Sequence, residues 1–180
     1  MNFQTFFALG MKRYIPDLLA PAGVSIDVGA SGKYRVPGAT MHIGSPDWLF
    51  PRDHLPVPDD SVAVIHAYHF LEHLSGADAV LFLREVERVL KPGGVLSFSV
   101  PYFSSSLSAQ DLDHKSQWCE DTFSNLFEND TYDHFGKWQL NVHFLMVAGI
   151  AHRNLALLGQ LIKGPRPKGP SKWYYPTEIK

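Results

Sequence analysis

The stretch SVAVIHAYHFLEHLSGADAVLFLREVERVLKPGGVLSFSV, residues 61–100, decides the fold. Its first part, 61–68, is a compact, mostly apolar run of the kind that forms a strand buried on both faces. Over 77–90 apolar side chains recur at helical spacing and charged side chains cover the opposite face, which predicts an amphipathic helix. The run KPGG ends that helix, and the alternating VLSFSV, 95–100, predicts a second strand.

Shorter elements are predicted on both sides of this stretch: strands over 24–28, 39–43 and 138–147, and helices over 5–19 and 153–163. Strands that alternate with helices form βαβ units. The expected fold class is therefore α/β, a short single domain with a Rossmann-like, mostly parallel sheet and helices on both faces. We expect this domain to span 1–163, with a polar, substrate-facing insertion at 101–135, and an extended tail to follow at 164–180.

Composition restricts the partners. The chain has 180 residues, 45% of them hydrophobic, and its 16 basic and 18 acidic side chains give a net charge of −2. Such a balance does not favour nucleic acid as a partner. The single cysteine, Cys119, fits a reducing compartment. The longest apolar run, 144–151, is far shorter than the roughly 20 residues of a membrane span. We expect a soluble, cytoplasmic protein, and the aromatic-rich insertion is compatible with a homodimer.

The first predicted strand leads into a turn of small residues, in the sequence IDVGASGKY, 26–34. The turn lacks the glycine and hydroxyl pattern of a phosphate-binding P-loop and the three glycines of a dinucleotide fingerprint. It can instead form a nucleoside cradle. Asp27 would accept hydrogen bonds from a ligand ammonium or hydroxyl, and four small residues would let the backbone approach closely: Gly29, Ala30, Ser31 and Gly32. The alternative is an ordinary turn without a ligand.

Three segments in order, DVGASG, RDHLPVPDDSVAVIHAYHFLEHL and FLREVERVLKPGGVLSFSVPYF, carry a more specific signal. Over 24–103 the chain resembles the class I S-adenosylmethionine-dependent methyltransferases of the small-molecule branch called type 11. The resemblance implies S-adenosyl-L-methionine as cofactor. It also implies methyl transfer to an oxygen or nitrogen of a small-molecule acceptor, such as a sugar, a lipid precursor or a related metabolite.

The resemblance also assigns residues to the cofactor. Asp27, Gly29 and Gly32 would border its methionine moiety, Asp53 and His54 would lie against its adenine, and three residues after the buried strand would line the methyl-transfer cleft: Ala67, Tyr68 and His69. The sequence departs from the family at two places. Its second loop glycine is Ser31, and the second strand lacks the acid that binds the ribose hydroxyls, with Asp47 the nearest carboxylate. A non-catalytic relative that binds S-adenosylmethionine or acts as a scaffold is therefore the alternative.

Histidines supply the candidate catalytic groups. Asp111 and His114 lie in the insertion, and a histidine beside a carboxylate can take a proton from an acceptor hydroxyl. With His69, they form the predicted catalytic set, for which no metal is expected. The alternative for these histidines is a structural role, and for the insertion a solvated loop. A remote alternative is a zinc hydrolase, because His69 to His73 match H-x-x-E-H, a motif that requires both histidines on one helix face.

Overall fold

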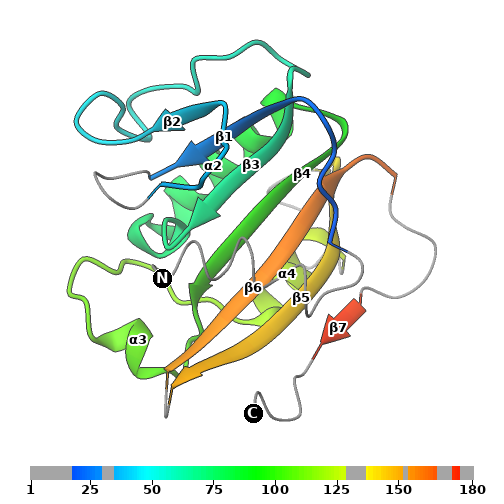
Figure 1. Ribbon diagram of the computed structural model, residues 1–180. Helices are drawn as coiled ribbons and strands as arrows, with labels where there is room; N and C mark the ends of the chain where they lie inside the picture. Colours follow the sequence, from blue (N-terminus) through cyan, green and yellow to red (C-terminus); the bar gives the residue numbers. More distant parts are fainter. Residues whose placement is uncertain (1–17, 30–34, 129–136, 152–153, 166–171, 175–180) are drawn as a thin grey trace.

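The computed structural model describes residues 18–29, 35–128, 137–151, 154–165 and 172–174. They form one seven-stranded sheet with the strand order β2-β1-β3-β4-β6-β5-β7 (Figure 1). The strands are β1 Val24–Val28, β2 Met41–Ile43, β3 Val62–Tyr68, β4 Leu90–Pro101, β5 Leu140–Ala151, β6 Asn154–Lys163 and β7 Lys172–Tyr174. The helices are the 3-10 helix η1 Leu71–His73 and the α-helices α2 Gly76–Val89, α3 Ser106–Ala109 and α4 Glu120–Phe127. The helix expected over 5–19 falls almost entirely outside the described residues.

The first four strands of the chain are parallel. β1 pairs with β2 on one side and with β3 on the other, and β3 pairs with β4. From β1 the chain continues to β2 on one side and then crosses to β3 on the other side, so the strand order reverses at β1. This places a topological switch point between β1 and β3. The remaining strands complete the sheet differently, because β6 is antiparallel to both β4 and β5, and β7 joins β5 in parallel. The α/β, mostly parallel architecture is confirmed.

The helices α2 and α4 pack on the same face of the sheet (Figure 1). Ser75 caps α2 by accepting a hydrogen bond from the Asp78 backbone, and the apolar stripe of the helix joins the main core. In α4, Phe123 stacks on Phe98 of β4 with ring centroids 4.6 Å apart. Part of the expected polar insertion thus belongs to the core. No helix within the described residues is both long and apolar enough to cross a bilayer.

The opposite face of the sheet is held to the segment before β1 by one buried side chain. The Gln160 amide on β6 donates to the Leu19 carbonyl at 2.8 Å and accepts from the Leu19 backbone amide at 2.9 Å. It also donates to the Ser97 hydroxyl at 2.7 Å. Both N–H donors and the carbonyl oxygen of the Gln160 side chain are hydrogen-bonded inside the fold, so this contact fixes where the chain enters β1.

The helix expected over 153–163 is wrong, because these residues form strand β6. Leu155 to Leu161 are a nearly continuous apolar run rich in leucine, for which intrinsic propensity favours a helix. Such a run cannot be assigned by periodicity when both of its faces are buried. Between β4 and β5 every residue from Ala156 to Leu161 is buried, and pairing with two neighbouring strands overrides the helical preference.

An ion-pair network holds the loop before β3 to α2. Arg88 donates to the Glu85 carboxylate through Nε at 3.0 Å and Nη2 at 2.9 Å, and to the carbonyls of Leu55 and Val57. Glu85 also accepts from the Leu55 backbone amide at 3.2 Å. The Arg88 hydrogen bonds lower the pKa of Glu85 to about 2, from an ordinary value of 4.5. Stability that depends on ionised Glu85 is therefore present above about pH 4.5 and is lost as the pH falls toward 2.

Glu85→Gln should remove this pH dependence of the free energy of unfolding. At neutral pH we expect the substitution to lower the free energy of unfolding by roughly 2–3 kcal/mol, because it removes a carboxylate paired with a guanidinium. The difference between the two proteins should shrink as the carboxylate is protonated on acidification. Urea unfolding followed by circular dichroism at a series of pH values measures it. A difference that stays constant from neutral to strongly acidic pH would contradict the assignment.

Candidate functional site

The candidate site lies at the carboxyl ends of β1 and β3, on the two sides of the switch point. In open parallel sheets ligands bind beyond these strand ends, where neighbouring connections diverge. Asp27 is the penultimate residue of β1, and His69 directly follows β3. The 3-10 helix η1 and the loop after α3 add further side chains at this edge.

Asp27 is buried and only half satisfied. Its side chain is 1% exposed, and Oδ2 accepts hydrogen bonds from the Val36 backbone amide at 2.8 Å and from His42 Nδ1 at 3.0 Å. Oδ1 is buried and has no hydrogen-bond partner among the residues that the structure describes. A buried carboxylate oxygen that lacks a donor is costly, and such a group calls for an explanation such as an unseen ligand, water or ion. Asp27 therefore offers an acceptor at the switch point.

The backbone conformation and the close packing of Phe70 both require a glycine at position 29. Its φ is +74°, and a Cβ added there would lie 2.8 Å from Cδ2 of Phe70, closer than carbon atoms pack at about 3.5 Å. The Phe70 ring thus closes on the turn directly after β1. Of the other predicted cradle residues, Ala30, Ser31 and Gly32 lie outside the described part of the chain. Their contact with a cofactor stays a prediction.

Asp53 forms hydrogen bonds within its own loop, and His54 contacts a carboxylate on α2. The Asp53 carboxylate accepts from the Leu49 backbone amide at 2.8 Å and from Arg52, whose hydrogen bond lowers the pKa of Asp53 to about 2. His54 Nδ1 lies 3.1 Å from Glu85 Oε1, and its side chain is 84% exposed. Neither side chain borders the cavities that described residues line beside Tyr68, between α2 and α4, or at His69. Their contact with adenine also stays a prediction.

Ala67 and Tyr68 occupy opposite faces of β3. Ala67 is fully buried in the core beneath α2. Tyr68 faces the other side, where it lines a cavity of about 380 Å³ with His66 and Ser97. Burial raises the pKa of Tyr68 and lowers the pKa of His66. Of the three residues predicted to line the methyl-transfer cleft, only His69 opens on the cavity that contains the candidate catalytic groups.

That cavity has a volume of about 290 Å³ and brings the three predicted catalytic side chains together. Its polar lining consists of His69, Glu72, His73, Gln110, Asp111 and His114. His69 and Asp111 come from segments about 40 residues apart in sequence, so the fold rather than local spacing creates the cluster. Glu72, whose carboxylate also lines the cavity, is not among the predicted catalytic residues. Burial of Glu72 could have been inferred from its position between two leucines of the core, Leu71 and Leu74.

The backbone of His69 is strained, and a contact with Glu72 orients its imidazole ring. Its φ is +52°, which is uncommon for a residue with a side chain and is concentrated at functional sites. The His69 amide donates to the Ser99 carbonyl of β4 at 2.9 Å. His69 Nδ1 lies 3.0 Å from Oε1 of Glu72, which is 1% exposed. An ionised carboxylate only accepts, so this contact places the proton on Nδ1 and the lone pair on Nε2.

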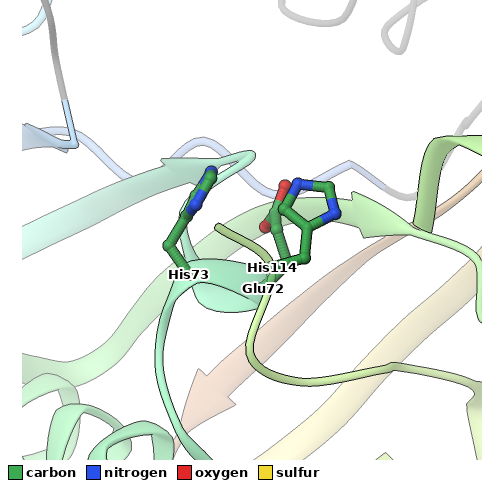
Figure 2. A group of neighbouring side chains, drawn as sticks. All are labelled: Glu72, His73 and His114. Atoms are coloured by element: carbon green, nitrogen blue, oxygen red, sulfur yellow. The ribbon is translucent and has the colours of Figure 1, made fainter. Parts of the chain in front are cut away.

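His114 has the same tautomer for a different reason. Its Nδ1 donates to the Ser108 carbonyl at 3.0 Å, which leaves the lone pair on Nε2. Nε2 lies 4.0 Å from Oδ2 of Asp111, and the His114 ring is 5.0 Å from the His73 ring between centroids. Figure 2 shows Glu72 and His73 rising from the turn of η1 and His114 meeting them from the loop after α3. The pairing expected of Asp111 and His114 is thus a near approach rather than a hydrogen bond.

The zinc hydrolase geometry predicted from H-x-x-E-H is not formed. That motif needs two histidines four residues apart on one helix face. His69 lies before η1 with a positive φ, and η1 has only 3 residues, Leu71–His73. The lone pairs of His69 and His73 therefore do not share a helix face.

Comparison with known proteins shows a methyltransferase fold. The family profile described as "Methyltransferase domain" matches residues 49–98. A putative methyltransferase from Haloferax volcanii, solved in complex with the Trm112 methyltransferase activator, is 14% identical with a TM-score of 0.56, over 92% of this chain and 96% of that chain. A SAM-dependent methyltransferase from Archaeoglobus fulgidus is 12% identical with a TM-score of 0.55, over 87% of this chain and 94% of that chain.

A third solved structure contains a ligand. The Burkholderia thailandensis 1,6-didemethyltoxoflavin-N1-methyltransferase, with bound 1,6-didemethyltoxoflavin and S-adenosylhomocysteine, is 11% identical with a TM-score of 0.59. The similarity covers 90% of this chain and 78% of that chain. No curated protein sequence matches the chain. At these identities the solved structures establish the fold.

Proposed function

We propose that this chain, which has the fold of the S-adenosylmethionine-dependent methyltransferases and resembles them in sequence over 49–98, binds S-adenosylmethionine beside Asp27. It transfers the methyl group to an oxygen or nitrogen of a small molecule held at His69. The observation that carries the proposal is the 290 Å³ cavity, in which His69, Asp111 and His114 meet next to the switch point of this fold. A cavity with convergent polar groups at that place is the expected location of a ligand site.

The residues that are described fit the methionine end of the cofactor. Oδ1 of Asp27 is a buried acceptor without a donor, and an ammonium group supplies three donors. At the adenine end, Asp53 already accepts hydrogen bonds from Leu49 and Arg52. The fit therefore rests on Asp27. When bound, S-adenosylmethionine supplies an activated methyl group, so the protein has mainly to position the acceptor and exclude water.

His69 is the proposed base for an acceptor hydroxyl. Nε2 of His69, which is buried at the cavity wall, would take the proton of the acceptor hydroxyl, while Glu72 holds Nδ1 and fixes the ring. The methyl group would pass from the sulfonium to the acceptor oxygen, with S-adenosylhomocysteine as the leaving group. His114 is the second candidate base, because its Nε2 also carries the lone pair and the residue lines the same cavity. Asp111 would orient the acceptor from the cavity wall. An unprotonated amine acceptor needs no base, and the same cavity would then act by positioning alone.

Calorimetry with S-adenosylmethionine and S-adenosylhomocysteine tests the cofactor assignment on the full chain. The proposal expects one site per chain, and absence of binding at millimolar ligand would overturn it. Formation of S-adenosylhomocysteine with a panel of hydroxyl and amine acceptors tests the methyl transfer. Binding without turnover on any acceptor would support the non-catalytic alternative, which the missing ribose acid and the packing of Phe70 on Gly29 also favour.

Asp27→Asn should weaken cofactor binding by roughly tenfold or more, because a charge-assisted hydrogen bond to a buried carboxylate contributes about 1.5–3 kcal/mol. The remaining amide oxygen can still accept from the Val36 backbone, so the fold should survive. Calorimetry with S-adenosylmethionine measures the change. Asp121→Asn, at an exposed carboxylate on α4, is the matched control and should bind like the wild-type protein. Equal affinity in both variants would rule out Asp27 as the ammonium acceptor.

A further inference from the structure

The geometry points to a divalent metal site of the Zn²⁺ class formed by Glu72, His73 and His114. One ligand atom from each of these three residues lies within 4.8 Å of the other two (Figure 2). Imidazole nitrogen and carboxylate oxygen are zinc ligands, and two histidines with one glutamate is the ligand set of catalytic zinc sites that keep a position open. The inference does not rest on the proposed methyl transfer, since it concerns binding of an ion to this chain alone. A bound ion would occupy Nε2 of His114 and would leave His69 as the candidate base in this cavity.

The carboxylate of Glu72 is the strongest sign of a missing cation. The residue is 1% exposed, and Oε1 contacts Nδ1 of His69. Within the described part of the chain, the buried Oε2 has no hydrogen-bond partner. A buried carboxylate is stable only when it is paired with a cation or fully hydrogen-bonded. Among the described residues, no lysine or arginine makes an ion pair with Glu72. A metal ion on Oε2 would supply the missing positive charge.

The imidazole of His114 is already oriented as a metal ligand. Its Nδ1 donates to the Ser108 carbonyl at 3.0 Å, so Nε2 presents a lone pair. Metal-binding histidines usually donate their second ring N–H to a carbonyl or carboxylate, which fixes both tautomer and ring orientation. The contact between Glu72 Oε1 and His69 Nδ1 orients the carboxylate in the same manner. Two of the three proposed ligands thus have their supporting hydrogen bonds in place.

The two segments that carry the ligands are fastened to each other. The carbonyl of Glu72 accepts from the backbone amides of Lys115 at 2.7 Å and Ser116 at 3.2 Å. The Ser116 hydroxyl donates to the Leu71 carbonyl at 3.1 Å. These bonds fix the loop of His114 against η1, so the ligand set is built into the fold.

The spacing of the ligand atoms requires little movement to close on an ion. Ligands about 2.0–2.1 Å from a tetrahedral zinc lie about 3.3–3.4 Å apart, against separations of up to 4.8 Å here. Small side-chain rotations, for which the half-buried ring of His73 has room, would bring the ligand atoms to this spacing. Asp111, whose Oδ2 lies 4.0 Å from Nε2 of His114, can act as a fourth ligand or leave that position open to the cavity.

Zinc binding by the full chain tests the inference directly. The protein is stripped with a chelator and equilibrated by dialysis at a fixed, buffered free Zn²⁺ concentration, and bound metal is counted by mass spectrometry. We expect one ion per chain, with affinity at least about 100-fold lower in Glu72→Gln and His114→Ala. His143→Ala on β5, which removes a histidine outside this cavity, should bind like the wild-type protein.

Folding of the variants is checked so that loss of binding can be interpreted. Glu72→Gln is nearly isosteric and still accepts from His69, and His73→Ala removes a partly exposed ligand, so at least one of them should keep the native circular dichroism spectrum. The visible bands of bound Co²⁺ would report the coordination in the wild-type protein. No binding by the wild-type chain, or equal affinity in folded Glu72→Gln, His73→Ala and His114→Ala, would overturn the site. Because no cofactor or acceptor is present, this outcome is separate from that of the methyltransferase tests.

Discussion

Replacing Gly159 with alanine should lower the free energy of unfolding by about 2–3 kcal/mol, a large effect for one added methyl group. Gly159 lies in β6 between Phe98 of β4 and Leu145 of β5. A Cβ at this position would lie 2.6 Å from Cζ of Phe98, 2.7 Å from Cδ2 of Leu145 and 2.8 Å from the carbonyl oxygen of Phe144. The last of these is backbone, which cannot move aside without disturbing the strand pairing.

Urea unfolding measures this effect, and Gly76→Ala is the matched control. Gly76 begins α2, and nothing lies within 4 Å of its added Cβ, so the same methyl group should be neutral or slightly stabilising there. A double-mutant cycle locates the clash: in a Phe98→Leu background, Gly159→Ala should cost less, because the shorter side chain withdraws the nearest atom. Additive effects of the two substitutions would show that Phe98 is not the obstacle.

The strand predicted over 138–147 is confirmed as β5, whereas β6 was not predicted, and the same glycine shows why. Residues 61–100 contain local signals for a strand, an amphipathic helix and a second strand. The structure forms β3 and α2 within one residue of the predicted bounds, whereas β4 begins at Leu90, five residues before the predicted strand. In β6 the apolar residues face both sides, so no period distinguishes a strand from a helix. What decides the conformation is the approach of β4 and β5 to Gly159, a contact between distant segments that local sequence does not contain.

The candidate site shows a similar division. Asp27, Asp111 and His114 are predicted as site residues from their own sequence context, and His69 from the resemblance to the methyltransferases. Their partners could not be predicted. The ring of Phe70 over Gly29 and the hydrogen bond of Asp27 to Val36 both depend on how loops cross the sheet edge. The buried Oε2 of Glu72 depends on the loop of His114 being fastened to η1.

His69→Ala is expected to reduce the rate of S-adenosylhomocysteine formation by roughly 10²–10⁴-fold, the usual contribution of a positioned general base. The effect follows from the proposed function and applies to any hydroxyl acceptor that the wild-type chain methylates. Affinity for S-adenosylmethionine should change little, because the proposed ammonium acceptor is Asp27 on β1 and not His69. Turnover assays and calorimetry on the same preparations separate the two quantities.

His69→Gly distinguishes a catalytic role from a structural one. Both variants lack the imidazole, but glycine adopts the φ of +52° without strain, whereas alanine keeps the cost of about 1 kcal/mol or more. We therefore expect His69→Gly to be the more stable variant in urea unfolding and yet as inactive as His69→Ala. If His69 served only to hold the turn between β3 and η1, glycine would restore turnover together with stability. Recovery of activity in His69→Gly would accordingly remove His69 from the proposed chemistry and leave His114 as the base.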